Sequence, residues 1–310
     1  MGKTVLMFPG QGSQYVGMAK DLFMHSDEVK ALYELASLEI GEDIAKISFE
    51  GPAEKLKESR FTQPAILLHS LAVLIALKDS LPKFDFACGH SLGEYGALAV
   101  AGALSFEQAI KVVVKRASLM EEACRKNRGT MAAIIGLDEK EVLQVCKDAS
   151  ASGVVVPANF NSKNQIVISG EIAAVQTACD NAKTAGAKRA LLLEVGGAFH
   201  SPLMQPARDG LKNYLEGVKF EEPTVSVVAN VTAQPVEKAA EIKRLLVEQI
   251  TAPVKWAQTM EFLIKNNVTA VIEIGPGKVL SGLAKRDMQP EKIISLDALS
   301  DIESWAAVAV

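Results

Sequence analysis

Strand-like and helical runs alternate along most of this chain, and this alternation limits its fold more than any other feature. The strand-like runs cover residues 4–8, 84–88, 225–231, 270–274 and 292–296. Helical runs stand between them and begin near residues 64, 92, 105, 239, 256 and 278. Strands separated by helices predict a largely parallel sheet, with functional sites at the carboxyl ends of the strands. We therefore expect Gln11, Ser91 and Gly275 on one edge of that sheet.

The alternation is interrupted between about residues 129 and 195. Strand-like runs at 131–136, 154–158, 166–169 and 190–195 enclose only two helical runs, 139–149 and 171–185. This β-α-β-β-α-β order is that of a ferredoxin-like unit. We therefore predict an α/β protein of two domains: a discontinuous, parallel-sheet, hydrolase-like large domain (residues 1–128 and 196–310) and an inserted ferredoxin-like small domain (residues 129–195).

Composition argues against several classes of function. A net charge of -4 gives no basis for nucleic-acid binding. The four cysteines are far apart and the histidines are not clustered, so neither a disulfide framework nor a metal site is expected. The most apolar helical run, residues 65–77, is shorter than the ~20 residues of a membrane span, and we expect it to be buried. Without a signal-like opening segment, the chain is expected to be cytoplasmic.

The segment FACGHSLGEYG contains a candidate nucleophile. Its strand-like run breaks at Gly89 into Ser91, which has a glycine two residues to either side, and a helical run follows. At a strand-to-helix junction, G-x-S-x-G makes a sharp turn that exposes the serine hydroxyl. The amide of Leu92 then lies in the first turn of a helix, where a negative charge is favoured. The alternative is a glycine-rich connection without catalytic function.

A catalytic serine needs a base, and the contexts of the four histidines favour one of them. His25 lies in a polar stretch and His69 on an apolar helix, where a hydrogen-bonded core histidine is expected. His90 neighbours Ser91 in a sharp turn, where adjacent side chains point in different directions. His200 lies in the loop VGGAFHSPLM, where the chain returns to the large domain. We favour His200 as the base over a structural histidine.

The third member of a catalytic triad is not evident. Asp138, Asp148 and Asp180 lie between Ser91 and His200 in the chain, as an α/β-hydrolase would require. All three belong to the predicted inserted unit and are typical of helix caps or solvated faces. A backbone carbonyl is the alternative partner for the imidazole N–H.

Two further features bear on the site. The turn FPGQGSQ lacks the Gly-Lys-Ser/Thr ending of a phosphate-binding loop, so it is either a flexible connection or the source of a second oxyanion donor, the Gln11 amide. Arg116 lies on the apolar stripe of its helix, with Val112, Val113 and Met120. A guanidinium there is either held in an internal ion pair, extended toward the surface, or poised to bind a substrate carboxylate.

Together these stretches resemble the malonyl-CoA:acyl carrier protein transacylases of dissociated fatty acid synthesis. The similarity covers nearly the whole chain in order and includes the helix of Arg116. The matching segments are FPGQGSQ (8–14), TQPA (62–65), GHSLGEY (89–95), NFNS (159–162), AFHSPLM (198–204), NVTA (230–233), QITAPVKW (249–256) and EIGPGKVLSGL (273–283).

The resemblance implies a role for each matching position. It implies that Ser91 carries the malonyl ester, that His200 is the base, and that Arg116 binds the malonyl carboxylate. It also implies that the amides of Gln11 and Leu92 form the oxyanion hole and that the Gln249 backbone carbonyl orients His200. The positions that line the pocket in this family are Gln63, His90 and Asn161.

The resemblance further implies a ping-pong reaction. Malonyl-CoA would acylate Ser91, and the phosphopantetheine thiol of an acyl carrier protein would take the malonyl group, with no bound cofactor and no metal. We expect a monomer with these two partners and neither nucleic acid nor a membrane. The alternatives are a free-standing acyltransferase of a polyketide synthase, an acyl-thioester hydrolase, and a non-catalytic docking protein, which the combination of Ser91, His200 and Arg116 disfavours.

Overall fold

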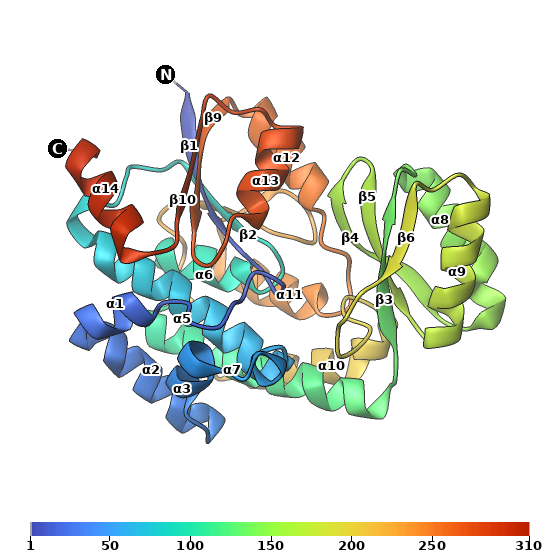
Figure 1. The fold of residues 1–310 in the computed structure, drawn as a ribbon, viewed down its shortest axis with the longest axis horizontal. Coiled ribbons are helices and arrows are strands. Elements are labelled where there is room, and N and C mark those ends of the chain that lie inside the picture. Colours follow the sequence, from blue (N-terminus) through green and yellow to red (C-terminus); the bar gives the residue numbers. More distant parts are fainter. Residues whose placement is uncertain (1, 310) are drawn as a thin grey trace.

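A computed structural model describes residues 2–309 of the chain, which form an α/β structure with a six-stranded and a four-stranded sheet (Figure 1). The six-stranded sheet contains β1 (Lys3–Phe8), β2 (Phe86–Gly89), β7 (Ser226–Val228), β8 (Pro235–Val236), β9 (Val268–Ile274) and β10 (Lys292–Leu296). Its order is β10-β9-β1-β2-β7-β8, and all pairs are parallel except β7 with β8. The prediction of a largely parallel sheet is confirmed.

Within residues 2–309, twelve α-helices lie outside the segment that forms the four-stranded sheet. They are α1 (Lys20–His25), α2 (Asp27–Ile40), α3 (Ile44–Glu50), α4 (Ala53–Leu56), α5 (Ser59–Leu77), α6 (Gly93–Val100), α7 (Phe106–Lys126), α10 (Gln205–Glu216), α11 (Ala239–Gln249), α12 (Trp256–Lys265), α13 (Val279–Asp287) and α14 (Leu299–Ala309). The sequence analysis did not predict α1 to α4, α10 or α14.

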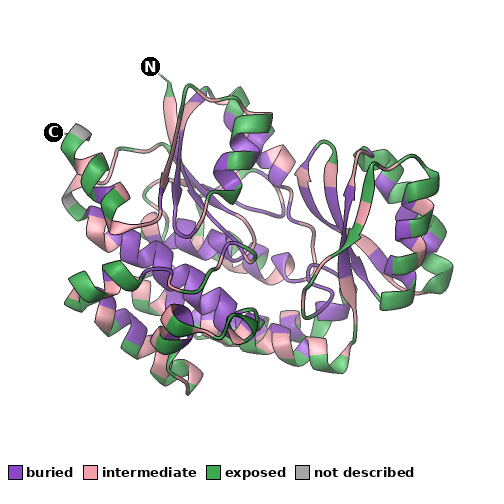
Figure 2. Cartoon of the chain, viewed as in Figure 1, coloured by how far each residue is buried: buried purple, intermediate pink, exposed green. Residues whose placement is uncertain are grey.

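Helices cover both faces of the six-stranded sheet. Alternate residues of β1 point to opposite sides: Leu6 and Phe8 join the core with α5, α6 and α7, whereas Val5 and Met7 pack with α12 and α13. A strand that is buried on both faces reads as a continuous apolar run, which explains why residues 4–8 show no polar alternation. Figure 2 shows the sheet as the buried centre of this part of the molecule.

Helix α5 is the central core helix. Within residues 2–309 it is the one helix whose length and composition would allow it to cross a membrane, and 83% of its most apolar window is buried inside the protein. The prediction of a buried helix is therefore confirmed. The predicted start near Pro64 is wrong, because α5 begins at Ser59. Proline is common in the first helical turn, but here the residues before Pro64 are themselves buried and extend the helix.

The four-stranded sheet is formed by the segment that interrupts the main alternation. It contains β3 (Thr130–Ile135), β4 (Val155–Ser162), β5 (Gln165–Gly170) and β6 (Arg189–Leu192), with α8 (Glu139–Ala149) and α9 (Ile172–Thr184) between them. The strand order is β4-β5-β3-β6, and all pairs are antiparallel. One face packs against α8 and α9, whereas Met131, Ala133 and Val167 on the other face join the large core. The predicted β-α-β-β-α-β order is confirmed.

The carboxyl ends of three adjacent strands form the edge that carries the candidate site. β9, β1 and β2 are neighbours and run in parallel, so the residues that follow them emerge at the same edge. Gln11 follows β1, Ser91 follows β2 and Gly275 follows β9. The prediction that these three residues share one edge is confirmed.

Candidate active site

Ser91 stands on a sharp turn between β2 and α6. Its φ of 50° lies in the left-handed region, which residues other than glycine rarely adopt. The flanking glycines make this turn possible, because a Cβ on Gly89 would lie 2.0 Å from the Gly93 carbonyl carbon. A Cβ on Gly93 would lie 2.0 Å from the Phe8 carbonyl oxygen. The two glycines are therefore needed to pack the turn against itself and against β1.

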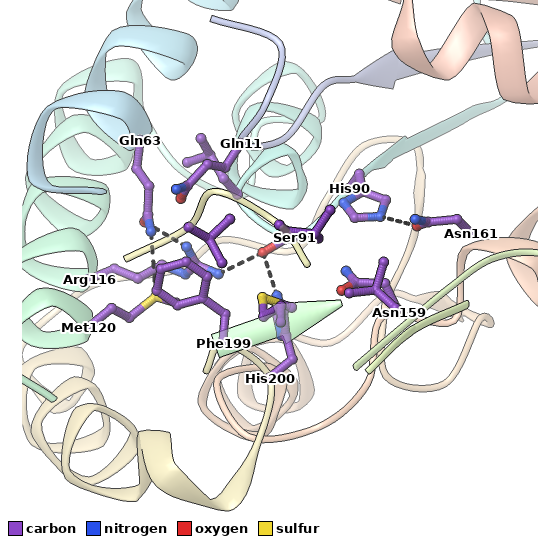
Figure 3. A pocket seen from close by; sticks show the side chains of 15 residues that line it. Gln11, Gln63, His90, Ser91, Arg116, Met120, Asn159, Asn161, Phe199 and His200 are labelled. Atoms are coloured by element: carbon purple, nitrogen blue, oxygen red, sulfur yellow. Dashed lines mark hydrogen bonds between the residues drawn. The ribbon is translucent and has the colours of Figure 1, made fainter. Parts of the chain in front are cut away.

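The Ser91 hydroxyl is hydrogen-bonded to the His200 imidazole, which is in turn hydrogen-bonded to a backbone carbonyl. Ser91 Oγ lies 2.8 Å from His200 Nε2 (Figure 3). His200 Nδ1 lies 2.8 Å from the carbonyl oxygen of Gln249. Because a carbonyl only accepts, Nδ1 carries the hydrogen and Nε2 is left free to accept the serine proton. No carboxylate is needed to set this tautomer.

The environment of His200 keeps its imidazole neutral. Burial, and then the positive charge of Arg116, lower the pKa of His200 to about 3, although its hydrogen bond to the Gln249 carbonyl acts in the opposite direction. His200 is 4% exposed. The side chain is therefore in the form that can accept a proton at neutral pH.

Arg116 reaches the same point from α7. The guanidinium is 1% exposed and donates from Nη1 to Gln63 Oε1 at 2.6 Å. Its Nη2 donates to Ser91 Oγ at 3.0 Å and to Gln249 Oε1 at 2.9 Å. None of these partners is a carboxylate, so the internal ion pair considered from the sequence is not what holds it. A buried cation with neutral partners is an attractive site for an anion.

The side chain of Gln249 links the three groups. Its Oε1 accepts from Arg116, while its Nε2 donates to the Ser91 carbonyl at 3.1 Å and to Glu94 Oε2 at 2.8 Å. Its backbone carbonyl is the partner of His200. One fully buried residue at the end of α11 thus contacts the serine, the imidazole and the guanidinium.

Two backbone amides near the serine are free to donate. Gln11 N and Leu92 N make no hydrogen bond within residues 2–309. The Ser91 amide, in contrast, donates to Asn230 Oδ1 at 2.7 Å. An oxyanion beside Ser91 would therefore find its donors in Gln11 and Leu92.

These groups line a cavity of about 170 Å³ between the two sheets. Eight residues named from the sequence lie on its wall: Gln11, Gln63, His90, Ser91, Leu92, Arg116, Asn161 and His200. Within it, His90 Nε2 lies 2.9 Å from Asn161 Oδ1.

The candidates that the sequence analysis disfavoured lie outside this cavity, as expected. His25 is exposed, His69 is a core residue bonded to the Asp297 carbonyl at 2.7 Å, and Asp138 caps α8.

The chain is similar to known proteins along most of its length. A family described as "Acyl transferase domain" matches residues 5–298. The chain belongs to the acyl transferase family.

Its relatives share both sequence and structure along their whole length. The malonyl CoA-acyl carrier protein transacylase of Bacillus subtilis (strain 168) is 44% identical over 304 residues, covering 98% of this chain and 96% of the relative. An acyl-carrier-protein-S-malonyltransferase from Bartonella henselae superposes with a TM-score of 0.94 at 40% identity, covering 100% of this chain and 99% of the other. A malonyl-transacylase in complex with a type II PKS acyl-carrier protein gives 0.93 at 39% identity, covering 99% of each chain.

The sequence reasoning missed several residues of this acyl transferase site. Glu94, Asn230 and the side chain of Gln249 form a buried polar network beneath Ser91. An apolar part of the cavity wall was also not predicted: Met120, Met131, Val167, Leu193, Val195 and Phe199. Asn230 offered no usable signal, because the strand-like run expected over residues 225–231 includes it, whereas β7 ends at Val228.

Proposed function

We propose that this acyl transferase moves a malonyl group from malonyl-CoA to the phosphopantetheine thiol of an acyl carrier protein, through an ester on Ser91. The observation that carries the proposal is Arg116, a buried guanidinium that contacts the nucleophile and has only neutral partners. A serine hydrolase acting on uncharged esters has no use for such a cation, whereas a malonyl group brings a carboxylate to it.

In the first half-reaction, Ser91 Oγ attacks the thioester carbonyl as His200 Nε2 takes the hydroxyl proton. The negative charge on the carbonyl oxygen is stabilised by the amides of Gln11 and Leu92. The C–S bond then breaks, coenzyme A leaves, and its sulfur receives the proton from His200. The products are the Ser91 malonyl ester and free coenzyme A.

In the second half-reaction, the carrier thiol occupies the place that coenzyme A left. His200 accepts the thiol proton, the sulfur attacks the ester carbonyl, and the Ser91 oxygen leaves with the proton. Binding of the malonyl carboxylate by Arg116 holds the acyl group in place during both steps. Gln63, His90 and Asn161 complete the polar part of the pocket.

The cavity suits a short acyl group and disfavours water. About 170 Å³ is below the ~300–1,000 Å³ of sites for drug-sized ligands. Much of the wall is apolar and includes Met131 and Val167 from the four-stranded sheet as well as Phe199 and Met120. Such a wall limits hydrolysis of the ester, which separates a transferase from an acyl-thioester hydrolase.

We assign the architecture to two domains. Residues 1–128 and 196–310 would form a hydrolase-like domain around the parallel sheet, and residues 129–195 a ferredoxin-like domain. The strand order β4-β5-β3-β6 with two helices on one face supports the second assignment.

The proposed partners are malonyl-CoA and an acyl carrier protein, and the proposed setting is a cytoplasmic monomer without cofactor, metal, membrane or nucleic acid. A structural relative bound to a type II PKS acyl-carrier protein supports the partner. It also favours a second candidate, the supply of malonyl groups to a polyketide synthase, which uses the same chemistry with a different carrier.

Mass spectrometry of the intact protein tests the function. Mixing with malonyl-CoA should add one malonyl group, which maps to Ser91 after proteolysis. Later addition of a phosphopantetheinylated carrier protein should remove it and add the same mass to the carrier. Release of the group as free malonate at an equal rate without carrier would identify a hydrolase instead.

The pKa of His200 predicts an unusual pH profile. A histidine of ordinary pKa, about 6.5, would be roughly nine-tenths protonated at pH 5.5 and lost as a base. Since the pKa of His200 is lowered to about 3, it remains a base there. Burial raises the pKa of Glu94 to about 7, so Glu94 itself titrates in this range.

The profile is therefore best measured in the Glu94→Gln protein, which removes that titration and keeps an oxygen for the Asn230 and Gln249 donors. We expect the rate of Ser91 acylation to change by less than about twofold between pH 7.5 and 5.5. A tenfold fall over this range in a folded protein would mean that His200 has an ordinary pKa.

A further inference from the structure

Asn230 occupies a position that the reaction steps above do not use. It follows β7, the neighbour of β2 in the six-stranded sheet, and is 1% exposed. Its side-chain Oδ1 accepts a hydrogen bond from Ser91 N at 2.7 Å. Its Nδ2 donates to the Gly89 carbonyl at 2.7 Å. A single side-chain amide therefore holds the main chain of the nucleophile turn at two points, one on each side of His90.

These two hydrogen bonds extend the pairing of β2 with β7, with a side chain in place of strand backbone. The β2–β7 ladder ends with Cys88 opposite Val228. Beyond that point the chain turns away into the Ser91 conformation, and its polar main-chain groups would lose their partners. The Asn230 amide supplies one acceptor and one donor where the next strand residues would have done so.

The backbone of Asn230 is itself fixed at two points. Its backbone N donates to Glu94 Oε2 at 3.0 Å, and its carbonyl accepts from Lys255 N at 3.0 Å. Glu94 in turn accepts from Gln249 Nε2 at 2.8 Å. The side chain therefore presents its amide to the turn from a rigid support, which is what a positioning group requires.

The left-handed conformation of Ser91 needs such a support. Backbone in this region persists where the surrounding structure over-determines it. By binding the Ser91 amide, Asn230 also removes that donor from the acyl site. The amides without a partner that remain beside the cavity are those of Gln11 and Leu92, to which we assign the carbonyl oxygen.

We propose that Asn230 is a positioning residue for the nucleophile. Its side-chain amide holds the turn so that Ser91 Oγ meets His200 Nε2 and the acyl carbonyl meets the Gln11 and Leu92 amides. This inference rests on the proposed transfer through Ser91. It assigns Asn230 no contact with the substrate, so the residue acts on the rate of acylation and not on the recognition of the malonyl carboxylate.

The test compares Asn230→Ala with wild type and a matched control. We expect the acylation rate constant at saturating thioester to fall by about 10²-fold, the scale for misplacing a reacting group by about 1 Å. The fall should be the same for malonyl-CoA and acetyl-CoA, with the half-saturating concentration of malonyl-CoA unchanged. Asn266→Ala is the control, because its Nδ2 also donates to a backbone carbonyl, that of Phe262 at 2.8 Å, and neither residue lines the cavity. It should acylate at the wild-type rate.

A second variant keeps the test decisive if Asn230→Ala does not fold. Asn230→Asp keeps the shape and an acceptor for the Ser91 amide but loses the donor to Gly89, and we expect at least a tenfold loss with the same pattern. Circular dichroism establishes folding. A folded Asn230 variant that acylates at the wild-type rate, or that loses only the malonyl reaction, would overturn the inference. If wild type and Asn266→Ala are not labelled at Ser91, the proposed function itself fails.

Discussion

Ser91→Ala should abolish uptake of the malonyl group, and His200→Ala should slow it by about 10²–10⁴-fold or more. The serine oxygen forms the ester bond, so its loss leaves no site for the acyl group. His200 Nε2, 2.8 Å from that oxygen, is the base within reach that the tautomer leaves free. Rapid-quench measurement of acyl-protein from labelled malonyl-CoA gives both rates.

His25→Ala is the control for the loss of a histidine, because this side chain is exposed and does not line the cavity. It should match wild type. Burial raises the pKa of the Cys88 thiol, and that side chain is fully buried, so thiol acylation is not expected there. Malonyl label on any cysteine of Ser91→Ala, formed at the wild-type rate, would show that the nucleophile has been misassigned.

Local signals predicted the segments whose ends are fixed by local contacts. The helix expected over residues 139–149 is observed with those bounds, because Asp138 and Glu141 form a reciprocal capping box. The helix expected to begin near residue 256 also agrees, since α12 begins at Trp256. The parallel sheet followed from the order of strand and helix alone, and with it the placement of Gln11 and Ser91 at one edge.

Segments fixed by tertiary packing were harder to predict. Helix α5 runs through Pro64, since burial of the preceding turn outweighs the missing hydrogen bond. The short helices α1, α3 and α4 have too few residues for a clear periodic pattern, and packing against the rest of the core stabilises them.

The residues of the site also separate into those that local sequence signals predicted and those that depend on tertiary contacts. Ser91 and Arg116 were found because each breaks a local pattern, the serine between two glycines and the charge on an apolar stripe. His200 required elimination among the four histidines. Asn230 and Glu94 act through hydrogen bonds to a segment far away in the chain, and nothing local distinguishes them from a loop asparagine or a helix glutamate.

Arg116→Ala should lower kcat/KM for malonyl-CoA by roughly 3–5 kcal/mol, which is about two to four decades in rate. Burial lowers the pKa of Arg116 although the Glu94 carboxylate acts in the opposite direction, and the hydrogen-bond partners of the guanidinium are neutral. A malonyl carboxylate offsets that cost through charge-assisted hydrogen bonds, and it is left buried and unpaired when the guanidinium is removed.

Acetyl-CoA has no carboxylate, so its acylation rate should stay the same or rise, and the preference for malonyl over acetyl should collapse. Arg116→Lys should recover only part of the malonyl rate, because an ammonium keeps the charge but lacks the planar fork. The measurement is acyl-enzyme formation from both thioesters in wild type and in each variant.

Arg244→Ala is the matched control for the loss of an arginine. Arg244 is exposed, pairs with Glu248, and lies on α11, the helix that carries Gln249, so its removal should leave both acylation rates unchanged. A thermal melt separates a specific effect from unfolding, because Arg116→Ala also leaves the Gln63 and Gln249 acceptors unpaired. The ratio of the malonyl to the acetyl acylation rate decides the role of Arg116. If the malonyl and acetyl rates fall together in a folded Arg116→Ala protein, the guanidinium supports the Ser91 turn and the carboxylate is bound elsewhere.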